Sequence, residues 1–329
     1  MTHIVLKAVA GLALASAITG GAAVASDDGH AIEPQRWSFS GVRGRFDKEQ
    51  LKRGFQVYKE VCSTCHSIKR LSFRNLGEKG GPEFPEDQVQ GLAATYKITD
   101  GPNDAGKMFK RPGRPSDRIP DPYLNAAEAR SVNRGALPPD FSLLAKARGV
   151  EAEKPFYMVP WAMLKEIFLS GGYQEGGPDY IYALLNSYKE NAPAFREVQG
   201  RMIAVDEAAA AANPSDTSIQ RCASMSESEP GKPEICNKLS EGMYFNMTYP
   251  GQQIGMPNPL GSDGLVTYKD GTPSTRENYA HDVAAFLAWA ADPKLEERKR
   301  LGAAAVIYLL ITSILLYIAK QRVWAKEPH

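Results

Sequence analysis

The chain has few cysteines, few histidines and no excess of charge of either sign. Its 329 residues include four cysteines and five histidines, and 39 basic residues against 38 acidic ones give a net charge of +1. A protein that mainly binds nucleic acid usually has a clear excess of positive charge, so we expect no nucleic-acid partner. Repeats of fixed period are also lacking, which argues against a solenoid. The hydrophobic content of 43% is enough for a folded core.

Charged residues are missing from a long stretch near the N-terminus. Residues 8–25 are apolar, rich in alanine and glycine, and end in Ala23-Val24-Ala25. This pattern predicts a signal peptide over residues 1–25 that is cleaved after export. An uncleaved membrane helix is the alternative, but such helices usually contain more bulky apolar side chains.

A second stretch without charge, residues 301–319, lies near the C-terminus. As a helix it would be about 28 Å long, close to the thickness of the hydrocarbon layer of a membrane. A buried core helix is the alternative, but a core helix is rarely apolar on every face. We therefore predict that residues 296–329 form a transmembrane anchor followed by a short cytoplasmic tail.

The orientation of this anchor follows from the predicted signal peptide. Basic residues lie on both sides of the span, so the positive-inside rule does not determine its orientation. Export of the N-terminus would place residues 26–295 outside the cytoplasm. In a bacterium, the chain would be a single-pass protein of the inner (cytoplasmic) membrane with its main domain in the periplasm.

The rest of the chain is predicted to be mainly helical with long loops. Residues 46–76 and 274–291 have helical patterns, whereas residues 77–140 and 242–273 are rich in glycine, proline, asparagine and aspartate. Residues 204–214 also favour a helix, and 215–234 are predicted to be a surface loop. Long loops between few helices are typical of a protein folded around a cofactor.

Capping residues and apolar spacing define the two main helices. Asp47 with Gln50, and Ser274 with Glu277, have the spacing of capping boxes. One apolar face is expected on each helix. The first face contains Leu51, Phe55, Tyr58 and Val61, and the second contains Val283, Phe286, Leu287 and Ala290.

The most specific motif is Cys62-Ser63-Thr64-Cys65-His66, a C-x-x-C-H sequence. Two thiols one helical turn apart can add to the vinyl groups on one porphyrin edge, and the adjacent imidazole can ligate the iron. A zinc site would need two further ligands, and a disulfide would leave His66 without a role. We therefore predict one covalently bound haem c.

The two remaining cysteines, Cys222 and Cys236, are far from this motif in the sequence. In an oxidising compartment such a pair is expected to form a disulfide. It would close a loop in a segment rich in serine and glutamate and would stabilise that loop.

The second axial ligand of the iron is expected to be a methionine. His30 lies close to the predicted mature N-terminus, and His281 lies in a predicted helix where an imidazole more often has a structural role. Met256 lies in Gly255-Met256-Pro257-Asn258-Pro259, a stiff loop that could fix a thioether in place. Met243 and Met247 are close in the sequence, and spacing alone leaves the choice open.

Several segments together resemble the cytochrome c1 family, the c-type haem subunits of the cytochrome bc1 complex. They follow one another in family order from about residue 46 to the anchor. Extra residues around 150–178 and 190–240 resemble bacterial members. The matching segments are residues 53–67, 100–103, 108–113, 134–140, 249–257, 270–273 and 286–291.

The resemblance implies a fold and a set of site residues. The fold would be a mainly α, class I cytochrome c-like haem domain with long loops and insertions, plus one C-terminal transmembrane helix. Cys62 and Cys65 would carry the haem, with His66 and Met256 as the axial ligands of the iron. Arg130 would face a haem propionate, although its sequence context also fits a solvated helix surface.

The resemblance also implies a function. The chain would pass electrons from a Rieske iron–sulfur protein to a soluble or membrane-tethered cytochrome c, with cytochrome b as its partner in the membrane. The whole complex would oxidise quinol and translocate protons, but we expect no catalytic site in the isolated chain. A freestanding membrane-tethered monohaem shuttle is one alternative. A haem sensor or peroxidase with an open iron position is another.

Overall fold

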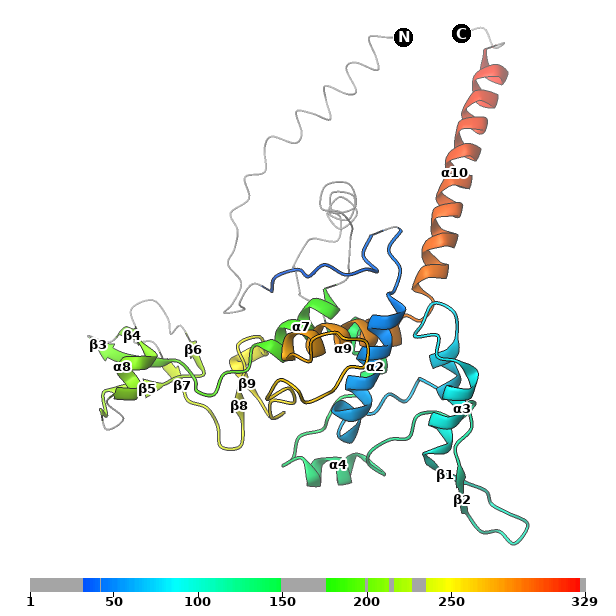
Figure 1. Ribbon diagram of the computed structural model, residues 1–329. Helices are drawn as coiled ribbons and strands as arrows, with labels where there is room; N and C mark the ends of the chain where they lie inside the picture. Colours follow the sequence, from blue (N-terminus) through cyan, green and yellow to red (C-terminus); the bar gives the residue numbers. More distant parts are fainter. Residues whose placement is uncertain are drawn as a thin grey trace. The chain divides into compact units, whose positions relative to one another are not determined.

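A computed structural model describes residues 32–41, 43–148, 176–198, 201–212, 216–226 and 235–325 (Figure 1). The predicted signal peptide and His30 lie outside these residues. The described part is mainly helical, as predicted. Its α-helices are α2 (Lys48–Glu60), α3 (Glu86–Ala94), α4 (Ala126–Val132), α5 (Leu144–Ala147), α7 (Gly177–Asn186), α8 (Glu207–Ala212), α9 (Arg276–Ala291) and α10 (Leu295–Trp324).

The remaining regular structure consists of short turns and small antiparallel sheets. Short 3-10 turns are η2 (Cys62–Thr64), η3 (Phe73–Gly77), η4 (Phe141–Leu143) and η6 (Pro250–Gln252). One hairpin pairs β1 (Lys97–Asp100) with β2 (Phe109–Pro112), and a sheet of order β4-β3-β5 contains β3 (Ala194–Val198), β4 (Arg201–Val205) and β5 (Ile219–Arg221). The other pairs are β6 (Ser224–Ser226) with β7 (Ile235–Asn237), and β8 (Tyr244–Phe245) with β9 (Gln253–Ile254).

The core forms where α2 packs against α9. Leu51, Phe55 and Tyr58 of α2 are buried, as their spacing predicted. Helix α9 is buried around most of its circumference, because α2, α5, α7 and η4 all contact it. The prediction of a single apolar face was therefore too narrow for α9, which lies at the centre of the core.

The helix boundaries differ from the sequence prediction in two places. Helix α2 ends at Glu60 rather than continuing to residue 76, and the chain then turns through η2. Asp47 caps α2 as predicted, but the Gln50 side chain donates to His281 Nδ1 at 2.8 Å instead of completing a capping box. Helix α9 is capped by Thr275, one residue after the predicted Ser274.

The segment 77–140 contains the hairpin of β1 and β2, whose base is held by an ion pair. Arg111 on β2 donates to both carboxylate oxygens of Asp117, at 2.6 and 2.9 Å. It also pairs with Asp100 on β1. The Arg111 guanidinium holds the pKa of Asp117 at about 2.

This ion pair predicts an acid-dependent loss of stability. An unpaired aspartate has a pKa of about 3.9, so the contribution of the Asp117 carboxylate is complete above that pH and is lost as the pH falls towards 2. We expect Asp117→Asn to lower the unfolding temperature at pH 7 by about 2–4 °C or less, because surface pairs contribute little. Thermal unfolding from pH 7 to 2 measures this, with Asp104→Asn as the control. A difference from the wild type that persisted at pH 2 would contradict the prediction.

The described residues between 192 and 237 include the sheet β4-β3-β5, the pair β6-β7 and the predicted disulfide. Cys222 follows β5, Cys236 lies in β7, and the two are joined with a Cα–Cα distance of 5.2 Å. The predicted helix over 204–214 is present as the shorter α8. The predicted surface loop 215–234 includes β5 and β6, and part of it lies outside the described residues.

Helix α10 contains the predicted span, residues 301–319. It is 30 residues long, and no residue in its most apolar stretch is buried. Its length and composition fit a single-pass membrane anchor. Its first turns contact the segment that precedes α2, since Glu296 accepts from the Phe46 amide at 3.0 Å and Lys299 donates to the Phe39 carbonyl at 2.5 Å.

Candidate haem site

The C-x-x-C-H motif forms a tight turn directly after α2. The amides of Cys65 and His66 both donate to the Cys62 carbonyl, at 3.1 and 2.9 Å. Both thiols are free and half-buried. Burial raises the pKa of Cys62 to about 12, which keeps its thiol protonated at neutral pH. The turn thus places two cysteines and a histidine within five residues.

The zinc alternative lacks further ligands in the part of the chain that the structure describes. No group of three or more His, Cys, Asp or Glu side chains is arranged there to hold a metal ion. Cys222 and Cys236 are bonded to each other. Cys62 and Cys65 are therefore not joined by these cysteines in a four-ligand site.

The His66 ring is oriented by a carbonyl group. His66 Nδ1 lies 2.9 Å from the Pro139 oxygen, and because a carbonyl can only accept, Nδ1 carries the proton. Nε2 then keeps its lone pair for an iron ion. The ring is buried and stacks on Phe141 with centroids 4.0 Å apart. Burial lowers the pKa of His66 and so favours the neutral form that ligates a metal.

Residues 138–142 are bound to the chain that follows His66. The Phe141 amide donates to the Ser67 carbonyl at 2.8 Å, and Asp140 accepts from the Ser67 hydroxyl at 2.8 Å. Asp140 also accepts from the Lys69 amide at 3.0 Å. The sequence assigns no role to Pro139 or Phe141. Pro139 lies within residues 134–140, which belong to the resemblance, and Phe141 directly follows them.

The loop that contains Met256 lies beside Ala136, two residues before Pro138. A Cβ atom placed on Gly255 would lie 3.5 Å from Ala136 Cβ and 3.8 Å from Met243 Sδ. Met256 is half-buried, and its carbonyl accepts from Tyr188 Oη at 3.1 Å. Met247 instead packs against a separate cluster of Ala192, Ala223 and Phe245. Residues 135–139 therefore contact both His66 and the Met256 loop, with Met243 next to that loop.

Arg130 is exposed at the last turn of α4. Its Nη1 donates to the Gly135 carbonyl at 2.9 Å, and the Gly135 amide donates to the Arg130 carbonyl at 2.7 Å. The side chain therefore supports the start of the 135–139 segment. Its proposed contact with a propionate stays a prediction.

The segment 123–137 contains a tyrosine next to Cys65 and several exposed apolar side chains. Tyr123 interacts with Cys65, and its hydroxyl accepts from Asn133 Nδ2 at 2.9 Å. Large apolar side chains lie exposed in the same segment of the chain: Leu124 is 92% exposed, Val132 66% and Leu137 45%. The two cysteines and the unprotonated Nε2 of His66 are the groups that a covalently bound haem needs.

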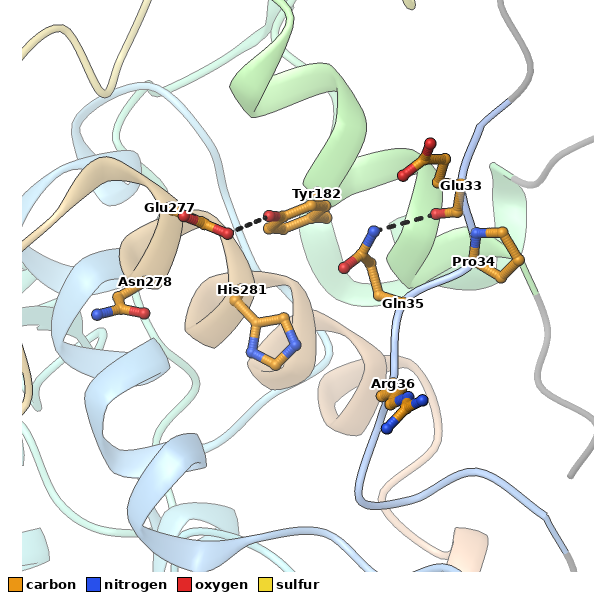
Figure 2. A pocket seen from close by; sticks show the side chains of 8 residues that line it. All are labelled: Glu33, Pro34, Gln35, Arg36, Tyr182, Glu277, Asn278 and His281. Atoms are coloured by element: carbon orange, nitrogen blue, oxygen red, sulfur yellow. Dashed lines mark hydrogen bonds between the residues drawn. The ribbon is translucent and has the colours of Figure 1, made fainter. Parts of the chain in front are cut away.

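His281 has structural contacts in a different part of the molecule. A pocket of about 450 Å³ is lined by residues 33–36, by Tyr182 of α7 and by the first turns of α9, including His281 (Figure 2). The His281 ring stacks on Trp37 with centroids 4.4 Å apart. None of the residues predicted to bind haem lines this pocket.

Comparison with known proteins shows which family the chain matches. The model of the cytochrome C1 family matches residues 37–327. A cytochrome c1 of Rhodospirillum rubrum is 39% identical over 329 residues, which is 100% of both chains. A cytochrome c1 of Blastochloris viridis is 37% identical over 321 residues, 97% of this chain and 96% of the relative. A cytochrome b/c1 of Bradyrhizobium diazoefficiens is 40% identical over 97% of this chain but only 40% of its own length. With a family match over most of its length and relatives of this identity, the chain belongs to the cytochrome C1 family.

Proposed function

We propose that this chain is the haem subunit of a bacterial cytochrome bc1 complex and passes electrons from a Rieske iron–sulfur protein to a cytochrome c. The observation that carries the proposal is the C-x-x-C-H turn, with His66 oriented by Pro139, in a chain of the cytochrome C1 family. The complex would oxidise quinol and translocate protons. The isolated chain would have no catalytic site of its own.

The proposal assigns one haem c to this site. Cys62 and Cys65 would hold it through thioether bonds, and His66 and Met256 would be the axial ligands. When bound, the haem supplies a one-electron redox centre whose potential is raised by a methionine ligand. Pro139 fixes the His66 tautomer, and Phe141 covers one face of the imidazole and keeps water from it.

The proposal also places the chain in the membrane. Residues 1–25 would be removed on export, residues 26–295 would form the periplasmic haem domain, and α10 would anchor the chain in the inner membrane. The name and length of the Bradyrhizobium cytochrome b/c1 support cytochrome b as the partner in the membrane. A donor and an acceptor that bind in turn need small, weak interfaces, because tight ones would slow exchange.

Co-purification tests this function directly. We expect a mild-detergent pull-down of the tagged chain to bring b-type haem and an iron–sulfur signal with it, and quinol to reduce its c haem. A lone c haem that quinol does not reduce, under conditions that preserve other complexes, would indicate the tethered shuttle instead. Ready binding of carbon monoxide by the ferrous wild type would indicate an open iron position and thus a sensor or peroxidase.

A further inference from the structure

A buried asparagine connects α7 to the turn that leads to Met256. Asn246 is fully buried, and its Nδ2 donates to the Leu184 carbonyl of α7 at 2.8 Å. Its Oδ1 accepts from the Ser187 hydroxyl at 2.9 Å and from the amides of Thr248 and Tyr249 at 3.0 and 3.1 Å. One side chain thus fixes the start of the turn onto the end of a core helix, with all its contacts inside the protein.

A second contact reaches the Met256 residue itself. Tyr188, just after α7, forms a β-bridge with Asn246, and its hydroxyl donates to the Met256 carbonyl at 3.1 Å. The backbone of Asn246 also donates to the Gln252 carbonyl at 3.1 Å, which closes the intervening turn. Tyr188 and Asn246, which are paired through the β-bridge, therefore hold the loop at two points: Asn246 at its entry and Tyr188 at Met256.

The Met256 loop has few other ways to be held. Pro257 and Pro259 have no amide hydrogen, so the backbone around Met256 offers few donors. The loop contains no helix or strand between β9 and α9. In a loop with so few backbone hydrogen bonds, the side chains of Tyr188 and Asn246 help to fix where the thioether lies.

We propose that Tyr188 and Asn246 form a clamp that positions Met256 and so keeps its thioether bound to the iron. The inference rests on the proposed function, because it needs Met256 as the axial ligand. Tyr188 acts through the backbone of Met256 and is a positioning residue, not a ligand. Whether the iron keeps its methionine ligand, and hence the choice between electron transfer and ligand binding, then depends on Tyr188 and Asn246.

The test uses the full-length, membrane-bound protein with its haem and the variant Tyr188→Phe. This change removes one hydroxyl and keeps the ring. We expect the charge-transfer band of methionine-ligated ferric haem to weaken and carbon monoxide affinity of the ferrous form to rise on the order of tenfold, as for loss of a buried hydrogen bond. Covalent haem content should stay unchanged. Asn246→Asp, which loses the donor to Leu184, should shift both readouts in the same direction.

Tyr182→Phe is the matched control. It removes a tyrosine hydroxyl from α7, six positions before Tyr188, and this hydroxyl donates to Glu277 of α9 rather than to the Met256 loop. We expect this variant to match the wild type in both readouts. A clamp that served stability alone would lower the unfolding temperature of Tyr188→Phe without changing the band.

The outcomes separate the clamp from the function on which it rests. If the wild type shows the methionine band and Tyr188→Phe behaves like Tyr182→Phe, the clamp is overturned and the ligand assignment stands. If the wild type lacks the band and binds carbon monoxide as Met256→Leu does, both are overturned. Weakening of the band in Tyr188→Phe and Asn246→Asp, but not in Tyr182→Phe, supports the clamp.

Discussion

Replacing Gly54 with alanine is expected to lower the unfolding temperature of the chain strongly and to reduce the yield of haem-loaded protein. Gly54 lies where α2 meets α9, and a Cβ atom there would lie 2.1 Å from the Asp282 carbonyl oxygen and 2.7 Å from Phe286 Cβ. Carbon atoms pack at about 3.5–4.0 Å, so the two helices would have to separate. Overpacking of a core costs up to about 3 kcal/mol or more, which exceeds the gain of about 1 kcal/mol in helix propensity.

The neighbourhood of Gly54 makes relief of this clash costly. Asp282 is buried and accepts from Arg53 Nε at 2.8 Å, so moving its backbone also disturbs an ion pair. If one partner of such a pair moves out of position, the other is left as a buried, unpaired charge, which lowers stability. The crossing point therefore has no flexible side chain that could give way.

Thermal unfolding and the yield of haem-loaded protein measure this effect. Gly91→Ala in α3 is the matched control, because a Cβ atom there would meet nothing within 4 Å. We expect Gly91→Ala to be neutral or stabilising by up to about 1 kcal/mol. A Gly54→Ala protein with wild-type yield and unfolding temperature would refute the packing argument.

The parts of the fold that depend on local sequence were predictable. The cap at Asp47 and the end of α9 at Ala291 follow from residues within a few positions of each other. The choice between Ser274 and Thr275 was not predictable, because both hydroxyls have the chemistry of a cap. The Ser274 hydroxyl instead accepts from the Tyr268 amide at 3.4 Å, a contact that arises only in the folded chain.

The candidate haem site also has a part that local sequence predicts and a part that arises only in the folded chain. Cys62, Cys65 and His66 form one turn, so their spacing alone predicts the chemistry. Pro139 and Tyr188 act on residues 73 and 68 positions away, and no local pattern joins such pairs. Periodicity also could not show that α9 is buried on most faces, because alanines fit both a core and a surface.

Met256→Leu is expected to leave the haem attached but to open the iron. The thioether bonds of Cys62 and Cys65 would be intact, so covalent haem content should not change. Leucine has no atom that can ligate iron, so the ferrous form should bind carbon monoxide. Axial ligands set haem potentials over a range of roughly 0.8 V, and we expect the potential to fall on the order of 0.1 V.

The control for this change is Met243→Leu. Met243 lies beside the same loop, with Sδ 3.8 Å from a Cβ atom placed on Gly255, and was an alternative ligand by sequence. If Met256 is the ligand, Met243→Leu should keep the wild-type spectrum and potential, since leucine fills a similar volume. Redox titration and carbon monoxide binding of the two variants decide the matter. An open iron in Met243→Leu with a normal spectrum in Met256→Leu would move the axial bond to Met243, and the loop held by Tyr188 would then support the haem without ligating it.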